Sequence, residues 1–138
     1  MSPQVVVAKQ NTNAEQISAR LLAGEFNGLP VVDNNGSVVG IVTAIDILKA
    51  IRDEGGNRQL NTMVAKDIMT PDPSVVEKGA SMEDVIDIMV KKQIELVPVV
   101  EDDGSKKLIG VVARLDILRE KLNEGFIIMG KRGAVART

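Results

Sequence analysis

Short apolar runs and amphipathic stretches alternate along the first part of the chain. Residues 5–8 and 29–33 form apolar runs rich in valine, which is typical of strands. Between them, Ala14, Ile17 and Leu21 fall on one face of a helix. The pattern therefore predicts a strand, a helix and a second strand, in that order.

A hairpin and a second helix are predicted next. Gly36 follows two asparagines, and such residues tolerate the positive φ angles of a tight turn, so residues 38–43 are expected to return as the antiparallel partner strand. Ile45 and Leu48 then keep helical spacing until the glycines at 55–56 end the helix. The first half of the chain thus has the order β-α-β-β-α.

The same order returns in the second half. After a lead-in at residues 63–69 and two prolines, Ser81 is placed to cap a helix. Strands are predicted at 97–101 and 108–113, and a last helix from 114 to about 122. The apolar stripe on the capped helix has a spacing typical of core packing, with a binding groove as the alternative. The stripe consists of Met82, Val85, Ile86 and Met89.

Equivalent residues in the two halves lie at constant separations. The separation is 68 residues before the hairpin turn and 70 after it, so a two-residue insertion in the second hairpin accounts for the difference. This duplication predicts an α/β fold of the α+β type, in which two β-α-β-β-α repeats share a core and enclose a ligand cleft. The matched pairs are Pro30 with Pro98, Gly36 with Gly104, Gly40 with Gly110 and Asp46 with Asp116.

The repeats suggest boundaries for the whole chain. We assign residues 1–54 to the first repeat, 55–63 to a linker, 64–124 to the second repeat and 125–138 to a C-terminal tail. The apolar run at the start of the tail, Phe126-Ile127-Ile128-Met129, is expected to pack against the body of the protein or against a partner subunit.

Composition narrows the chemistry that the chain can perform. The sequence has no His, Cys, Trp or Tyr, which excludes an imidazole base, a thiolate nucleophile and His or Cys metal sites. A net charge of −2 and only two Phe argue against nucleic acid as a partner. No apolar run approaches the roughly 20 residues that span a bilayer, so we expect no membrane association and a cytoplasmic location. The acidic residues 101–103 are interpreted as a solvated hairpin tip rather than a metal site.

Thr43 and Asp46 stand where a predicted strand passes into a helix. A carboxylate at this place can accept both hydroxyls of a ribose cis-diol, and a threonine hydroxyl with the helix N-terminus can hold a neighbouring phosphate. The same spacing also fits a capping box, with Thr43 as the cap and Asp46 three residues later. Both interpretations remain open from the spacing alone.

The second repeat carries Ala113, Arg114 and Asp116 at the equivalent place. The capping hydroxyl is lost, and a cation stands in the first helical turn, where the helix dipole disfavours it. Arg114 therefore either faces an anion such as a phosphate or pairs at the surface with Glu120 or Asp116.

The chain resembles a tandem pair of cystathionine-β-synthase (CBS) domains, also called a Bateman module. The resemblance covers about residues 5–123 and rests on motifs in family order: the lead-in Lys66-Asp67-Ile68-Met69-Thr70-Pro71, the cap at Ser81, the strand Val97-Pro98-Val99-Val100 and the helix at Asp116-Ile117-Leu118. It implies that the two repeats are related by pseudo-twofold symmetry and that the protein forms a homodimer shaped as a flat disc. It also implies clefts between the repeats that bind AMP, ADP, ATP or a compound like S-adenosylmethionine, and control of a partner protein.

The resemblance also implies two unequal sites. The more complete one is expected to have all its walls, formed by Thr43, Asp46, Thr70, Pro71, Asp72, Ile94, Glu95 and Leu96. The weaker one lacks a hydroxyl at Ala113 and is expected to lack a lead-in before the first repeat. It would comprise Phe26, Asn27, Gly28, Arg114 and Asp116.

The sequence supports two alternative hypotheses for the function. The first is a non-catalytic regulatory module that senses adenine nucleotides or adenosyl compounds and requires no cofactor and no metal. The alternative is a dimerisation or protein-interaction module whose clefts are vestigial. An enzyme is disfavoured, because no pair of titratable groups stands in an apolar context that would tune their pKa values.

Overall fold

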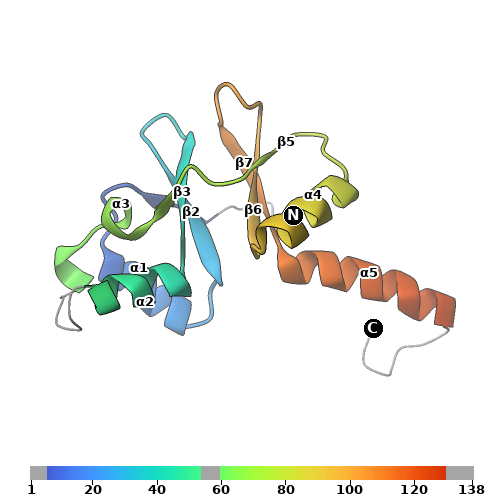
Figure 1. Cartoon of the computed structure of the whole chain (residues 1–138), viewed down its shortest axis with the longest axis horizontal. Coiled ribbons are helices and arrows are strands. Elements are labelled where there is room, and N and C mark those ends of the chain that lie inside the picture. The colour runs from blue at the N-terminus through green and yellow to red at the C-terminus, as the bar shows by residue number, and fades with distance from the viewer. Residues whose placement is uncertain (1–5, 54–59, 130–138) are drawn as a thin grey trace.

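The computed structural model describes residues 6–53 and 60–129, with side chains up to residue 122. Both repeats have the predicted β-α-β-β-α order, which confirms the fold class (Figure 1). The first repeat consists of β1 (Ala8–Lys9), α1 (Ala14–Leu22), β2 (Gly28–Val32), β3 (Val38–Thr43) and α2 (Ala44–Asp53). The second consists of β5 (Val76–Glu77), α4 (Met82–Lys92), β6 (Leu96–Val100), β7 (Leu108–Ala113) and α5 (Arg114–Met129).

Three short elements connect the repeats: the 3-10 turn η1 (Leu60–Thr62), the helix α3 (Ala65–Ile68) and the strand β4 (Thr70–Pro71). The strand order is β1-β2-β3-β4 in one sheet and β5-β6-β7 in the other. Because β4 pairs antiparallel with β3, the segment that leads into the second repeat forms the edge of the first repeat's sheet.

The duplication extends to the register of the hairpins. Pro30 is opposite Ile41 in the first hairpin, and Pro98 is opposite Val111 in the second. Each hairpin also has an irregularity at the same place, between residues 31 and 32 and between residues 99 and 100. The 68- and 70-residue separations in sequence therefore correspond to equivalent positions in space.

Each repeat has its own apolar core. Val31 and Val42 are fully buried in the first, together with Ile17 from α1 and Ile47 from α2. In the second core, β6 meets one face of α4. Two of the four residues of the predicted apolar stripe are buried there, as core packing requires, whereas Met82 and Ile86 are only partly buried. The buried members are Val85 and Met89, which cluster with Val76, Val97 and Val99.

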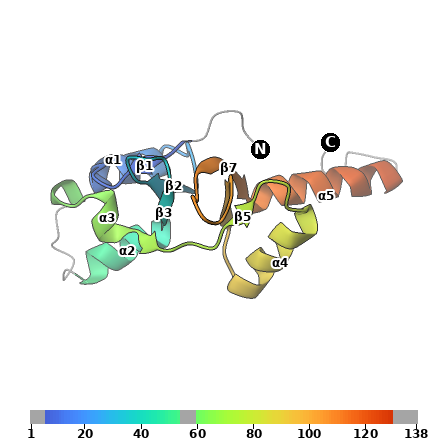
Figure 2. The same ribbon diagram turned by 90° about the horizontal axis from the view of Figure 1, so that it is seen from above.

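The two repeats are joined where their hairpins lie side by side (Figures 1 and 2). The amide of Val38 donates to the carbonyl of Lys106 at 2.9 Å, and the amide of Leu108 donates to the carbonyl of Gly36 at 3.1 Å. The hydroxyl of Ser37 adds a bond to the carbonyl of Ser105 at 2.7 Å. Main-chain pairing thus fixes the orientation of one repeat against the other.

Two predicted boundaries differ from the structure. Among the described residues, the first strand is β1 at Ala8–Lys9 and does not include residues 6–7, because Ala8 and Lys9 are the ones that pair with β2. The last helix does not end near residue 122 but continues through Gly125 to Met129 as α5. A single glycine inside a helix costs about 1 kcal/mol relative to alanine, which neighbouring helix formers offset.

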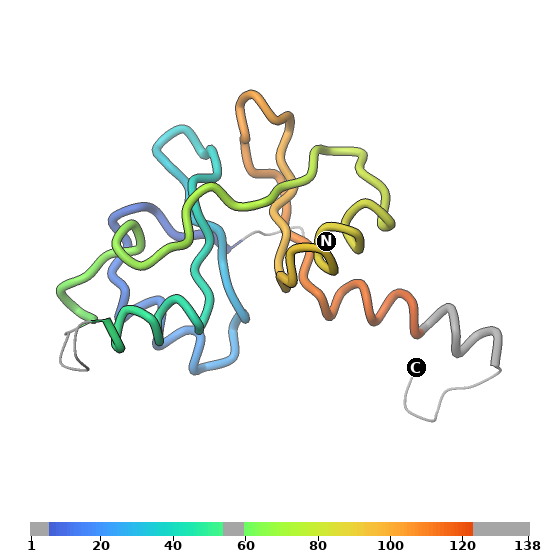
Figure 3. Tube along the Cα trace, viewed as in Figure 1, coloured from blue at the N-terminus to red at the C-terminus, as the bar shows by residue number. Residues whose placement is uncertain are grey.

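Some expectations lie outside the described residues. They are the start of the first strand at Val5, the glycines at 55–56 and most of the linker around them, and the tail beyond Met129. The side chains of residues 126–129 are likewise outside the described set, so the packing expected of them stays a prediction. Figure 3 follows the chain through the described elements in order, from β1 to α5.

Candidate functional site

The Thr43–Asp46 pair lies at the end of β3 and the start of α2, as predicted. Thr43 is the last residue of β3, and α2 begins at the next residue, so Asp46 stands in the first helical turn. The backbone amide of Thr43 donates to Asp46 Oδ2 at 2.8 Å, and the hydroxyl of Thr43 donates to the same oxygen at 3.1 Å. The carboxylate therefore satisfies one of the free amides of the helix start.

A third hydrogen bond reaches Asp46 from another part of the chain. The hydroxyl of Thr70, on β4, donates to Asp46 Oδ1 at 2.6 Å. Asp46 is only 7% exposed, and it is the one buried charged residue in the part of the chain that the structure describes. The expected approach of Thr70 to Asp46 is therefore present, and the carboxylate joins the first repeat to the lead-in of the second.

Gly28 shows how close the opposite repeat comes to this site. A Cβ atom built at Gly28 would lie 3.0 Å from Thr43 Cγ2 and 3.6 Å from Leu96 Cδ2. Leu96, one of the expected walls, thus lies across the repeat boundary from the end of β3. Gly28 itself was expected in the weaker site, and it lies beside Thr43 because the two residues are paired in the first hairpin.

The other expected walls have contacts of their own. Asp72 is directed to the second hairpin, where its Oδ1 lies 3.6 Å from Lys106 Nζ. Ile94 packs on the core of the second repeat. Pro71 pairs with Gly40 at the edge of the sheet. Among the predicted walls, direct contact with the Asp46 carboxylate is made by Thr43 and Thr70.

The weaker site is more open. Asp116 accepts the backbone amide of Ala113 at 2.9 Å, as Asp46 accepts that of Thr43. Its side chain is 47% exposed, and its other oxygen is 3.7 Å from Arg119 Nη1. Asp116 at the start of α5 therefore makes the same capping bond as Asp46, but its side chain is not buried.

Arg114 pairs with a residue that the sequence analysis assigned to the other site. Its guanidinium lies 3.4 Å from Glu95 Oε1, and its amide donates to the Glu95 carbonyl at 2.8 Å. Of the two interpretations of Arg114, the structure shows a surface ion pair, but with Glu95 instead of Glu120 or Asp116, because the turn before β6 brings Glu95 next to the start of α5. Both side chains are 58% exposed, so the ion pair contributes little to stability.

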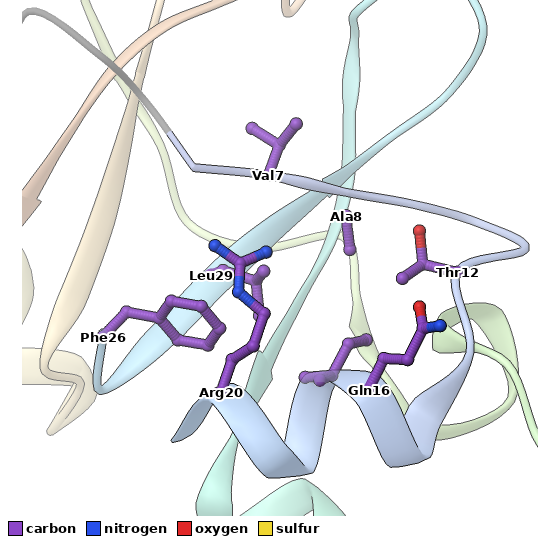
Figure 4. Close-up of a pocket in the computed structure, with 8 residues that line it drawn as sticks. Val7, Ala8, Thr12, Gln16, Arg20, Phe26 and Leu29 are labelled. Carbon is purple, nitrogen blue, oxygen red and sulfur yellow. The ribbon is translucent and has the colours of Figure 1, made fainter. Parts of the chain in front are cut away.

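Phe26 borders a small cavity between α1 and β2 (Figure 4). The guanidinium of Arg20 lies 5.2 Å from the centre of the Phe26 ring and also pairs with Glu25 at 2.8 Å. The cavity volume is about 50 Å³, well below the roughly 300–1,000 Å³ of typical ligand pockets. The cavity as it stands does not accommodate a nucleotide base.

The acidic hairpin tip has roles within its own turn. The backbone amide of Ser105 donates to Asp102 at 2.7 Å and holds the pKa of that carboxyl below its usual range. The amide of Asp103 donates to Glu77 at 2.8 Å.

Within residues 6–53 and 60–122, no three His, Cys, Asp or Glu side chains are grouped as metal ligands. No helix in the described chain is long and apolar enough to cross a membrane.

One signal in the sequence was overlooked. Met1-Ser2-Pro3 precedes Met69-Thr70-Pro71 by the same 68 residues that separate the repeats, so the first repeat does have a counterpart to the end of the second lead-in. Ser2 is the counterpart of Thr70. Residues 1–3 lie outside the described chain, so this match between the two segments rests on the 68-residue spacing in the sequence.

Comparison with known proteins identifies the family. The family model of the CBS domain matches residues 1–53 and again residues 65–123. The chain therefore belongs to the CBS domain family and contains two CBS repeats.

Curated relatives contain the same pair within longer chains. Inosine-5'-monophosphate dehydrogenase of Methanocaldococcus jannaschii is 32% identical over 117 residues, which cover 85% of this chain and 21% of that protein. The chloroplastic CBS domain-containing protein CBSX1 of Arabidopsis thaliana is 28% identical over 140 residues, covering 84% of this chain and 58% of that protein. The chain thus spans only part of the length of these relatives.

Solved structures share the fold over nearly the whole chain. CBSX2, determined in complex with AMP, has a TM-score of 0.73 at 29% identity and covers 91% of this chain and 94% of its own. The CBS domain pair of protein MJ0100 was determined with 5'-methylthioadenosine and S-adenosyl-L-methionine. It has a TM-score of 0.75 at 30% identity and covers 90% of this chain and 93% of its own. Both structures contain adenosyl ligands.

Proposed function

We propose that this protein is a regulatory module that binds an adenine nucleotide or adenosyl compound between its CBS repeats and performs no catalysis. The observation that carries the proposal is the buried Asp46 carboxylate at the start of α2, held next to hydroxyl groups at the boundary of the repeats. The adenosyl ligands of CBSX2 and MJ0100 support the ligand class. The proposed setting is the cytoplasm, with a partner protein that responds to occupancy.

The proposed binding mode follows from the donors and acceptors at the site. The Asp46 carboxylate would accept the ribose hydroxyls, because ionised acceptors form the stronger hydrogen bonds. Thr43 and the N-terminus of α2 would face the phosphate side, since helix starts favour negative charge. Leu96 would contribute an apolar wall from the other repeat. Asp116, with its more exposed carboxylate, is proposed as the anchor of a second site.

Thermal unfolding with added ligands tests this function. AMP, ADP, ATP, S-adenosylmethionine and NAD would each be added to nucleotide-free protein, and unfolding followed by circular dichroism. A ligand at 100 times its Kd is expected to stabilise the folded state by about 2.7 kcal/mol. Stabilisation by at least one adenosyl compound and none by guanosine monophosphate is the expected result. No shift with any ligand would contradict the proposal.

A second role, homodimerisation, is supported by apolar side chains on two helices. Positions 45 and 48 on α2 are repeated 70 residues later on α5, and all of these side chains are partly uncovered within the described chain. Because the repeats are related by pseudo-twofold symmetry, both present a similar apolar face, which a second copy of the chain could cover symmetrically. The exposed fractions are 58% for Ile45 and Leu48, 43% for Leu115, 46% for Leu118 and 57% for Leu122.

Substitutions on these helices test the dimer. The double variant Leu48→Glu, Leu118→Glu is expected to convert a dimer into a monomer, because it places two charges in each half of an apolar interface. Sedimentation velocity at micromolar concentration measures the change. Asn34→Glu serves as the control, since Asn34 is exposed in the turn between β2 and β3. Figure 1 shows this turn at the end of the hairpin away from α2 and α5. A monomeric parent protein would contradict the proposed dimer.

A further inference from the structure

The Asp46 carboxylate already accepts hydrogen bonds from hydroxyl groups, the same kind of donor that the ribose of a ligand would supply. Its Oδ2 accepts the amide and hydroxyl of Thr43, and its Oδ1 accepts the hydroxyl of Thr70 at 2.6 Å. A carboxylate offers about four acceptor positions, so three of them are in use. With Asp46 only 7% exposed, a ribose cis-diol cannot reach both oxygens while all three donors stay in place.

The three donors differ in how readily they can leave. The amide of Thr43 is fixed by the turn from β3 into α2, and its loss would leave a helix-start amide without a partner. The hydroxyl of Thr43 can rotate, but its bond lies on the oxygen that the amide already occupies. Thr70 comes from a different element and, among the described residues, is the one that donates to Oδ1, so its departure frees that oxygen without disturbing the start of the helix.

The strand that carries Thr70 has few attachments. β4 consists of two exposed residues, and one of them is Pro71, which has no amide hydrogen to donate. It pairs with Gly40 and Ile41 on β3. Beyond the strand, the amide of Asp72 donates to the Val39 carbonyl at 3.2 Å. Before the strand, Met69 packs on the core of the first repeat. A displacement that is limited to Thr70, Pro71 and Asp72 therefore breaks few interactions.

The second repeat provides an internal comparison. Asp116 keeps the capping bond from the backbone, to the amide of Ala113, at nearly the same distance as in Asp46. Among the described residues, no hydroxyl donates to it, and its side chain is 47% exposed. The helix start thus does not require a hydroxyl partner on its carboxylate, so the Thr70 bond serves something other than capping.

We propose that the Thr70 hydroxyl is a latch that competes with the ligand's ribose hydroxyl for Asp46, so that ligand binding releases β4 from β3. This inference rests on the proposed function and adds a mechanism to it. β4 forms the edge of the first sheet, yet it belongs to the segment that leads into the second repeat. Release of the latch would therefore transmit occupancy of the cleft to the connection between the repeats.

Calorimetric titration with AMP separates a latch from a ligand contact. Thr70→Val removes the hydroxyl at nearly constant size, and we expect it to tighten AMP binding by about 3- to 10-fold, the fold-change that corresponds to one net hydrogen bond. Thr70→Ser keeps the hydroxyl and is expected to bind AMP like the parent protein. Weaker or unchanged binding in Thr70→Val would overturn the latch, because it would make Thr70 a ligand contact or a bystander.

Amide exchange observes the strand directly. The amide of Asp72, bonded to Val39, is expected to exchange faster in the parent protein when AMP is bound, and to exchange fast in Thr70→Val even without AMP. Exchange that is slowed by AMP, or unaffected by both changes, would contradict release of β4. If AMP, ADP, ATP and S-adenosylmethionine all fail to bind to every variant, the proposed function is contradicted together with the latch, whereas binding weakened by Thr70→Val contradicts the latch alone.

Discussion

Asp46→Ala is expected to abolish stabilisation by AMP in a protein that still folds. The substitution removes the carboxylate that the proposed binding mode assigns to the ribose hydroxyls. Loss of its bond to the Thr43 amide is expected to lower the free energy of unfolding by about 1 kcal/mol, the usual cost of a lost helix cap. Thermal unfolding with and without AMP measures both effects, and the variant's midpoint should not depend on AMP.

Asp116→Ala provides the matched control. It removes the equivalent carboxylate of the second repeat and the same type of capping bond, but the loss of stability should be smaller, because Asp46 is buried and also accepts two hydroxyl bonds. We expect it to leave most of the AMP response, because Asp116 is exposed and lacks the hydroxyl contacts of Asp46 in the described chain. If Asp116→Ala alone abolished binding and Asp46→Ala were harmless, the assignment of the principal site would be wrong.

The repeated motifs made much of the fold predictable from the sequence. Helix caps are local signals, and Ser81 caps its helix as expected, with Asp84 completing a capping box; Asn13 caps α1 in the same way. Hairpin turns and buried faces are likewise local, because they depend on positive φ at positions such as Gly36 and on the period of apolar residues. Such features need no knowledge of distant contacts.

The differences arose where distant parts of the chain meet. The extent of β1 depends on which of its residues reach β2, and the partner of Arg114 depends on the turn that brings Glu95 beside it. Spacing alone could not decide between a capping and a ligand-binding role for Asp46. The structure shows that its carboxylate makes a capping bond and also contacts Thr70 across the connection between the repeats.

Leu29→Ala is expected to lower the free energy of unfolding by about 2–5 kcal/mol, the range for truncating a buried leucine. Leu29 is 2% exposed and lies in the core of the first repeat. Leu22→Ala is the matched control, because Leu22 on α1 is 90% exposed and its truncation should change stability by no more than about 0.5 kcal/mol. Since the chain has no Trp or Tyr, denaturation is best followed by circular dichroism.

The same experiment determines whether the repeats unfold as one unit. Main-chain bonds between the hairpins, such as that from Val38 to Lys106, would be lost if either repeat unfolded alone. We therefore expect a single transition in the Leu29→Ala protein, with amide signals of both repeats lost at the same denaturant concentration. Two transitions, the first confined to residues of the first repeat, would contradict this coupling. They would also remove the physical basis for transmitting cleft occupancy from one repeat to the other.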